Sequence, residues 1–528
     1  MQRLSSFVAG RWVEGQGAHA ALVNPATEEP LAEANADGID MGEVLHTARA
    51  QGGPALRAMT FAARASLLKE MSRQLHAARE ELLDLAQLNC GATRSDAKFD
   101  VDGAIGTLAA YAGVGEQLAA RAGERTFLVD GDMFPLARTP RHVGQHVWTS
   151  RVGVAVHVNA FNFPAWGTFE KVAAAFLAGV PVISKPATAT ALVAWRATRV
   201  LVDAGILPSG SLQLICGGTG DLLGRLGGQD GLAFTGSNAT GAMLRATPGF
   251  AARGVRVNVE ADSLNAAVFA PDVEPGSDSW NALVRHIVTD MTQKTGQKCT
   301  AIRRILVPRA QEAALREALL EALHGVVVGN TLEAGVTMGP VSTAGQLRDV
   351  VAGVQRLVDA GATLHCGGPA RIEGRGAPAG RGYFVAPTLL SVPDGAAAGP
   401  VHEHEVFGPV ATLLPYDGSA GAAACILSMG QGSLVSTVAS DDRAWLEQAV
   451  LGAAPFLGRL MLVSTKVADQ PIGPGMVLPS LVHGGPGRAG GGEELGGERG
   501  LAFYLQRTAL QGDRVIVGKL FGNDSGEA

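Results

Sequence analysis

Cys299 lies in a polar stretch of the sequence, TGQKCTA, that suits a reactive thiol. Gly296 before it and Thr300 after it predict a turn that leads into a helix or a strand. We expect the positive end of a helix and the neighbouring Lys298 to lower the pKa of the thiol, which would make Cys299 a nucleophile. The residues alone leave open the alternative that Cys299 is a small buried hydrophobic residue.

A carboxylate and a side-chain amide have the chemistry to assist such a nucleophile. Glu260 ends the strand-like stretch RVNVEAD, and a carboxylate after a buried strand can have a raised pKa and act as a general base. The alternative for Glu260 is a salt bridge with Arg253 or Arg256. Asn162, in AFNFPAW, can donate its amide N–H to a developing oxyanion. The alternative is an asparagine that forms a turn before Pro164.

Two further stretches suit phosphate or ribose groups. Lys185, in SKPA, ends a buried strand and can reach ribose hydroxyls or a phosphate, but it can equally be a solvated lysine at the sheet edge. In FTGSNATGAML, Gly236 and Ser237 end a strand and Asn238 begins a helix, whose free N–H groups and dipole suit a pyrophosphate. The alternative is a helix cap, in which Ser237 or Asn238 satisfies the first turn.

From residue 153 onward, strands alternate with the helices that must position these residues. The expected strands are VAVHV, VPVIS, LQLIC and GLAFT, and the expected helices cover residues 165–178 and 190–204. This alternation predicts a parallel, doubly wound sheet, in which ligands bind beyond the carboxyl ends of the strands. Those ends carry the polar turns 159–164, 184–186, 217–220 and 235–237.

The segments on either side follow other patterns. Leucines at helical spacing predict helix over residues 62–85, and residues 127–148 alternate like a hairpin. A second α/β unit begins after Val259 and includes an expected helix over residues 312–323. The tail from Pro471 is rich in glycine before the strand-like FYLQRTALQ, so both a linker and a tightly packed crossing are open.

The composition excludes several classes of protein. Hydrophobic residues make up 47% and charged residues 17%, with a net charge of −6, which rules out a disordered chain and a broad polycationic surface for nucleic acid. Five scattered cysteines without a CxxC pair predict no disulfide framework, no metal site and a reduced, cytoplasmic compartment. No apolar window is long enough for a membrane helix, so we expect no membrane partner. The low charged fraction favours an oligomer.

Taken together, the motifs resemble the aldehyde dehydrogenase superfamily. The motifs FVAGRWVEG, VNPATEE, FNFPAW, SKPA, FTGS, GQKC, EHEVFGPV and the glycine-rich tail follow the family's order and about its spacing over nearly the whole chain. The resemblance implies that Cys299 attacks an aldehyde carbon to give a thiohemiacetal. It also implies that Asn162 and the Cys299 backbone N–H hold the oxyanion, and that Glu260 activates the water that hydrolyses the resulting thioester.

The resemblance implies a nicotinamide cofactor as well. Glu405 should hold the nicotinamide ribose, Lys185 the adenosine ribose and Ser237 the pyrophosphate. The full set of residues expected around the cofactor is Phe161, Ser184, Lys185, Thr188, Gly236, Ser237, Glu405 and Phe407.

The sequence departs from the family's usual pattern at two places. Thr188 stands where NAD-preferring relatives often carry a glutamate that binds the ribose diol and repels a 2′-phosphate. A neutral threonine removes the repulsion and Lys185 can pair with the phosphate, so we expect NADP to be preferred, with NAD possible. After Glu260 the family usually has leucine and glycine, whereas this chain has Asp262 and Ser263, so we expect altered packing there.

The tail resembles more narrowly a bacterial branch that oxidises CoA-linked semialdehydes during the degradation of aromatic compounds. Some members of that branch are fused to a C-terminal hydratase domain, and we expect the stand-alone form because this sequence ends at Ala528. A general aliphatic or aromatic aldehyde dehydrogenase and a CoA-acylating enzyme are the alternatives, although acylating relatives generally lack the base. The non-enzyme alternative is a catalytically silent structural or binding homologue.

The family also implies an architecture. We expect an α/β fold with a doubly wound, Rossmann-like cofactor domain over residues 1–126 and 150–260 and an α/β catalytic domain over residues 261–470. Residues 127–149 and 471–528 should form a small β oligomerisation arm that pairs with a second subunit. We therefore expect a homodimer or a dimer of dimers.

Overall fold

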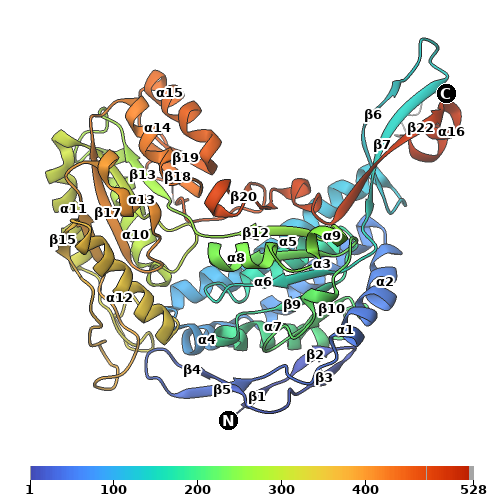
Figure 1. The fold of residues 1–528 in the computed structure, drawn as a ribbon, viewed down its shortest axis with the longest axis horizontal. Helices are drawn as coiled ribbons and strands as arrows, with labels where there is room; N and C mark the ends of the chain where they lie inside the picture. The colour runs from blue at the N-terminus through green and yellow to red at the C-terminus, as the bar shows by residue number, and fades with distance from the viewer. Residues whose placement is uncertain (1, 471, 523–528) are drawn as a thin grey trace.

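Two twisted sheets, each covered by helices, dominate the computed structural model, which describes residues 2–470 and 472–522. Figure 1 shows the two sheets in two lobes that lie side by side, with an arm that projects from the side opposite the second lobe. Within the described residues, no helix is both long and apolar enough to span a bilayer. The predicted mixed α/β fold is confirmed.

The first sheet carries the strands that were expected to hold ligand-binding turns. Its strand order is β12 (Arg256–Glu260), β11 (Gly231–Thr235), β8 (Ala155–Val158), β9 (Val182–Lys185), β10 (Leu212–Leu214), β2 (Ser6–Val8) and β3 (Arg11–Val13). The strands from β12 to β10 are parallel, and the chain runs from β8 outward to β10 before it returns to β11 on the other side of β8. That reversal makes a topological switch point between β8 and β11, where open α/β sheets bind their ligands.

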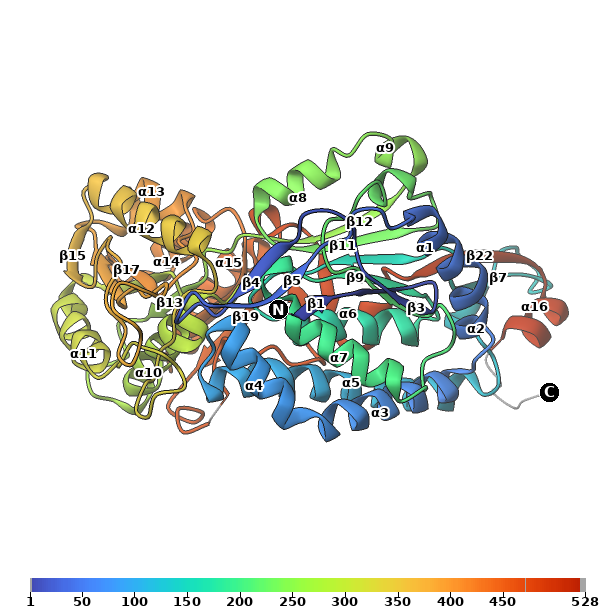
Figure 2. The same cartoon turned by 90° about the horizontal axis from the view of Figure 1, so that it is seen from below.

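Helices cover both faces of this sheet, and its strands are therefore buried on both sides. A large hydrophobic core holds one layer, which Figure 2 shows below the sheet: α2 (Gly53–Arg57), α3 (Phe61–Ala77), α4 (Arg79–Cys90), α5 (Arg94–Ala122), α6 (Trp166–Leu177) and α7 (Ala191–Asp203). A second core packs α1 (Met41–Thr47), α8 (Asn238–Arg245) and α9 (Phe250–Arg253) on the other face. The helix predicted over residues 62–85 is instead two helices, because the backbone leaves helical geometry at Ala78.

A small sheet of β1 (Gln2–Leu4), β5 (Pro30–Ala34) and β4 (Ala20–Val23) flanks the first lobe. The second lobe contains a sheet with the order β15 (Thr363–Cys366), β16 (Thr388–Ser391), β17 (Val410–Tyr416), β14 (Arg304–Pro308), β13 (Ala266–Phe269), β18 (Ser433–Ala439) and β19 (Leu457–Val463). Its helices are α10 (Asp278–Thr292), α11 (Glu312–His324), α12 (Ala344–Asp359), α13 (Gly399–Glu403), α14 (Ala420–Ser428) and α15 (Arg443–Ala453). Hydrophobic cores lie on both faces of this sheet too.

The arm consists of β6 (Leu128–Pro135), β7 (His142–Ser150), β22 (Leu505–Asp513) and α16 (Arg514–Phe521). The hairpin predicted over residues 127–148 is confirmed by the antiparallel pair β6 and β7. The strand-like end of the tail pairs with β7 along its whole length. Figure 1 shows the outer end of this sheet projecting beyond the lobes. At its inner end, Leu128 and Leu505 belong to the hydrophobic core of the first lobe.

The glycine-rich tail is a tightly packed crossing and not a linker. It forms β20 (Val482–Gly484) and β21 (Glu493–Leu495), and it runs against the end of β12. The Gly492 N–H donates to the Val259 carbonyl, and a side chain at Gly490 would place its Cβ only 2.1 Å from that same carbonyl oxygen. The crossing therefore fixes β20 beside the strand that ends in Glu260.

We expect Gly490→Ala to destabilise the protein because the added methyl group overlaps the Val259 carbonyl. Overpacking of this kind usually costs about 1–3 kcal/mol, and the thermal unfolding midpoint should fall accordingly. Gly491→Ala is the matched control, since Gly491 also has a positive φ (70°) but has open space around its Cβ position. Equal midpoints for the two variants would contradict a tightly packed crossing.

Candidate active site

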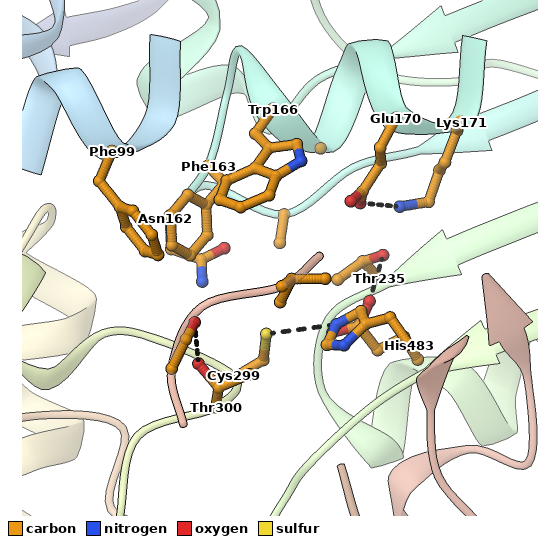
Figure 3. Close-up of a pocket in the computed structure, with 15 residues that line it drawn as sticks. Phe99, Asn162, Phe163, Trp166, Glu170, Lys171, Thr235, Cys299, Thr300 and His483 are labelled. Carbon is orange, nitrogen blue, oxygen red and sulfur yellow. Dashed lines mark hydrogen bonds and ion pairs between the residues drawn. The ribbon is translucent and has the colours of Figure 1, made fainter. Parts of the chain in front are cut away.

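Side chains from four separated segments meet in one pocket at the switch point of the first sheet. Asn162 comes from the loop after β8, Glu260 ends β12, Cys299 lies in the loop before β14 and His483 belongs to β20. The pocket has a volume of about 40 Å³. Figure 3 shows Asn162 and Cys299 facing the same space, with the sulfur directed toward His483. The structure thus brings together the three residues for which the sequence analysis proposed chemistry, Asn162, Glu260 and Cys299.

The loop that carries Cys299 is held in an unusual backbone conformation. Lys294, Thr295 and Gly296 all have positive φ angles, of 51°, 57° and 67°. The Thr295 hydroxyl donates to the Gly339 carbonyl at 2.9 Å, and the Asn265 amide donates to the Cys299 carbonyl at 2.7 Å. Consecutive left-handed residues persist only where the surroundings enforce them, and they often mark functional sites.

The expected activation of Cys299 by Lys298 and a helix is wrong. The Lys298 side chain is fully buried and donates to Asp290 at 2.6 Å and to Gln293 at 2.8 Å. Among the described residues, the segment from Cys299 to β14 contains no helix, so the thiol does not stand at the start of the expected helix. Burial, followed by the negative charge of Glu260, raises the pKa of Cys299 well above its usual value.

Glu260 is buried and makes a short contact with a residue that the sequence analysis did not select. The His483 Nε2 atom lies 3.0 Å from Glu260 Oε1 and 3.8 Å from Cys299 Sγ. Burial alone would raise the pKa of Glu260, but the charge of His483 and its hydrogen bond lower it below its usual value. The expected raised pKa is therefore wrong, and the cause is His483.

The alternative partners considered for Glu260 bind elsewhere. Arg253 donates to the Leu226 carbonyl, and Arg256 donates to the Leu505 carbonyl. His483 escaped the sequence analysis because it lies 223 residues from Glu260, in a glycine-rich stretch without local periodicity.

Asn162 occupies the opposite side of the pocket. Its amide nitrogen donates to the Gln297 carbonyl at 3.0 Å, which uses one of its two N–H groups and leaves the second for another acceptor. Behind it, the Asp100 carboxylate accepts the Trp166 N–H at 2.8 Å and so caps α6. Phe99 and Trp166 meet edge to face and form the apolar wall of the pocket.

A second, larger opening adjoins this pocket. It has a volume of about 490 Å³ and shares Phe99, Trp166 and Val477 with the first. One side of it is formed by α5, where Gly103, Gly106 and Ala110 leave the helix surface low. We call this opening the α5 groove, and its remaining lining residues are Ser95, Lys98, Asp102, Thr107, Gln293, Met476, Leu478 and Pro479.

The residues expected at the adenosine end lie at the ends of β9 and β11. Lys185 ends β9 and is partly buried, which lowers its pKa, and Thr188 begins a short 3-10 turn, Thr188–Thr190. The Ser184 side chain is fully buried and accepts a hydrogen bond from Asn159 at 3.1 Å. It is therefore engaged inside the protein, in contrast to Lys185 and Thr188.

At the start of α8 the structure has the helix cap that the sequence analysis left open. The Ser237 hydroxyl accepts the Thr240 N–H at 3.3 Å, and Gly236 precedes it at the end of β11. The Asn238 N–H, expected to be free, donates to the Asp262 carboxylate at 2.9 Å. The departure from the family pattern after Glu260 thus places a negative charge at this helix N-terminus.

The residues expected at the nicotinamide end form a cluster in the loop before β17. Glu405 accepts the Ser263 N–H at 3.0 Å and pairs with Arg303 at 3.3 Å. Burial raises the pKa of Glu405 to about 7, against the opposing charge of Arg303. Phe407 meets Phe161 edge to face at 5.9 Å. These side chains connect the second lobe to the loop that carries Asn162.

Comparison with known proteins shows which family has this architecture. The family model described as the aldehyde dehydrogenase family matches residues 12–508. The 3,4-dehydroadipyl-CoA semialdehyde dehydrogenase of Aromatoleum evansii is 45% identical to this chain, over 92% of this chain and 93% of its own length.

Solved structures agree in fold. Lactaldehyde dehydrogenase from Escherichia coli matches with a TM-score of 0.82 and 23% identity, over 96% of this chain and 99% of its own. Betaine aldehyde dehydrogenase from Staphylococcus aureus, solved with NAD+, matches with a TM-score of 0.82 and 22% identity, over 97% of both chains. The resemblance seen in the motifs is confirmed, and the chain belongs to the aldehyde dehydrogenase family of NAD(P)-dependent enzymes.

Proposed function

We propose that this protein oxidises a CoA-linked semialdehyde to the carboxylic acid with NADP as the hydride acceptor. The proposed substrate is 3,4-dehydroadipyl-CoA semialdehyde, in the aerobic degradation of benzoate through benzoyl-CoA. The observation that carries the proposal is the meeting of Cys299, Glu260 and Asn162 in one small pocket that adjoins the α5 groove. The similarity to the Aromatoleum evansii enzyme supports the choice of substrate.

In the first half of the reaction, the Cys299 thiol gives its proton to water, and the sulfur bonds to the aldehyde carbon. The carbonyl oxygen becomes an oxyanion, which the free N–H of Asn162 and the Cys299 backbone N–H stabilise. One such donor commonly contributes about 3 kcal/mol to transition-state stabilisation. A nicotinamide cofactor bound there would supply the acceptor for the hydride that leaves this carbon.

In the second half, Glu260 takes a proton from a water molecule whose oxygen attacks the thioester carbon. The carbon–sulfur bond breaks, the Cys299 thiolate leaves and the carboxylic acid is released. Glu260 suits this step because its side chain is buried beside Cys299 and is held as a carboxylate. A carboxylate base at this place also favours hydrolysis over transfer of the acyl group to free CoA.

The chemistry of the donor set fits a phosphorylated dinucleotide. Lys185 offers a cation and Thr188 a hydroxyl at the adenosine end, and Glu405 offers a carboxylate for ribose hydroxyls at the other end. The Ser237 hydroxyl and the α8 N-terminus would face the pyrophosphate, although Asp262 already accepts one N–H there. Phe407 and Phe161 would flank the nicotinamide end.

The sizes of the two openings support a long substrate that enters with its aldehyde first. The inner pocket, at about 40 Å³, holds little more than a carbonyl group and a water molecule, whereas the α5 groove measures about 490 Å³. The CoA end would therefore lie in and beyond the α5 groove. Binding energy from this distant part can position the reacting carbon.

We further infer that the arm pairs with a second copy of this chain. Its helix α16 exposes Val515, Ile516 and Leu520, each about 60% accessible, and the hairpin exposes Phe134 and Leu136. Apolar groups this accessible on a projecting element favour burial against a partner. A dimer, or a dimer of dimers, would cover them.

We expect Cys299→Ala to abolish NADPH formation from aldehydes, by about a thousandfold or more, because the nucleophile is removed. Cofactor binding and the circular dichroism spectrum should be retained. Cys425→Ala is the control, since Cys425 is an exposed thiol far from the pocket lining. Unchanged activity in Cys299→Ala would reject the proposed nucleophile.

We expect the wild-type enzyme to have a higher kcat/KM with NADP than with NAD, and Thr188→Glu to reverse this order. A carboxylate beside Lys185 repels the 2′-phosphate and binds the ribose diol, and the NADP value should fall about tenfold or more. Thr188→Ser should keep the wild-type preference. A wild-type enzyme with the higher kcat/KM for NAD would reject the proposed cofactor preference.

We expect Gly106→Phe to lower kcat/KM for the CoA-linked semialdehyde about tenfold or more, with little effect on a short aldehyde such as propanal. The Cβ position of Gly106 is open, so the phenyl group fits and fills the α5 groove. Gly113→Phe is the matched control, because Gly113 is equally open on the same helix but does not line the groove. An equal loss of kcat/KM for both aldehydes would contradict a role of the α5 groove in binding the CoA-linked substrate.

A further inference from the structure

We propose that His483 is a positioning residue whose imidazolium holds Glu260 as a carboxylate beside Cys299. This inference rests on the proposed role of Glu260 as the base. Its foundation is the geometry of the pocket, where His483 Nε2 lies 3.0 Å from Glu260 Oε1 and 3.8 Å from Cys299 Sγ. The dashed line in Figure 3 marks the contact between sulfur and imidazole.

Both side chains are buried, so without this contact Glu260 would be a buried carboxyl group with no cation hydrogen-bonded to it. Glu260 is 3% exposed and His483 is 4% exposed. A buried carboxylate without a cation pays a desolvation cost and tends to bind a proton, which would remove the base. An imidazolium at 3.0 Å offsets that cost by charge and by a charge-assisted hydrogen bond.

A neighbouring cation, Lys171, on α6, also lowers the pKa of Glu260, but less than His483 does. Lys171 is shared with two other carboxyl groups, because it lies 3.1 Å from Glu170 and 3.0 Å from Glu494. Two other charged groups act on His483: Arg459, on β19, disfavours its protonation, and Glu170, on α6, favours it. Burial lowers the pKa of His483, but the charge of Glu260 and its hydrogen bond outweigh burial, so the pKa of His483 is raised.

The pairing with His483 also reduces the effect of the Glu260 charge on the ionisation of Cys299. The negative charge of Glu260 opposes ionisation of the Cys299 thiol next to it. Because a positive His483 contacts both groups, its charge offsets much of the negative charge of Glu260 that acts on the Cys299 sulfur. The thiolate and the carboxylate can then exist in the same pocket during one turnover.

A cofactor-free reaction isolates the step in which Glu260 acts. With p-nitrophenyl acetate, the Cys299 sulfur bonds to the acetyl carbon, the ester C–O bond breaks and p-nitrophenolate leaves with the bonding pair. Water then attacks the acetyl-enzyme, Glu260 takes the water proton, the C–S bond breaks and acetate is released. The burst of nitrophenolate reports acylation, and the steady-state rate reports deacylation.

We expect His483→Gln to move the acid limb of the deacylation rate to higher pH. Loss of the positive charge raises the pKa of Glu260, so the carboxylate is lost as the pH falls through a higher value. Deacylation by His483→Gln at pH 6 should therefore fall about tenfold below wild type. At pH 8.5 the two rates should agree within about threefold.

The control variant is His286→Gln, which makes the same replacement on α10, outside the pocket lining. An equal loss at every pH, or an unchanged profile in His483→Gln, would overturn the inference and leave His483 a packing residue. Glu260→Gln should deacylate slowly and without an acid limb, and adding His483→Gln to it should not restore one.

One further readout keeps the inference testable if the His483 variant does not fold. In the wild-type enzyme the deacylation rate should stay level from pH 8 down to about pH 6, because the paired Glu260 titrates well below that range. A wild-type acid limb near pH 7 would overturn the inference. The proposed function fails separately, if Cys299→Ala retains the acylation burst.

Discussion

The active pocket must hold two groups that oppose each other's ionisation. A thiolate at Cys299 and a carboxylate at Glu260 are both needed in one turnover, yet each raises the cost of the other when water is largely excluded. The resting structure resolves the conflict in favour of the carboxylate: Glu260 is paired with His483, and the thiol keeps its proton. The rest of the site can be understood as the framework that allows this compromise.

That framework depends on where the chain reverses direction in the first sheet. The chain leaves β8 toward one edge of the sheet and leaves β11 toward the other, so the loop after β8 and the end of β12 open onto one space. The second lobe supplies Cys299 from the loop before β14, and the glycine crossing supplies His483 on β20. Each lobe alone therefore carries an incomplete set of groups, and the packed tail completes it.

The sequence was informative wherever local pattern determined structure. The strands β8, β9, β10 and β11 and the helices α6 and α7 lie within two residues of their expected bounds, because alternation and glycine stops are local signals. The approach of Asn162, Glu260 and Cys299 also followed from strand ends and motifs. What local pattern could not show was electrostatic: Lys298 turns away to Asp290, and His483 reaches Glu260 across 223 residues.

The polar departure after Glu260 shows why such residues are hard to interpret from sequence. Asp262 and Ser263 replace small or apolar residues, yet neither is left without a partner. Asp262 caps α8 in the first lobe, while the Ser263 N–H donates to Glu405 and its hydroxyl accepts the Leu434 N–H in the second lobe. This short segment therefore ties the strand of the base to both ends of the expected cofactor site. Its polarity serves the junction between the lobes, because an apolar pair there would leave the Asn238 and Leu434 N–H groups without these acceptors.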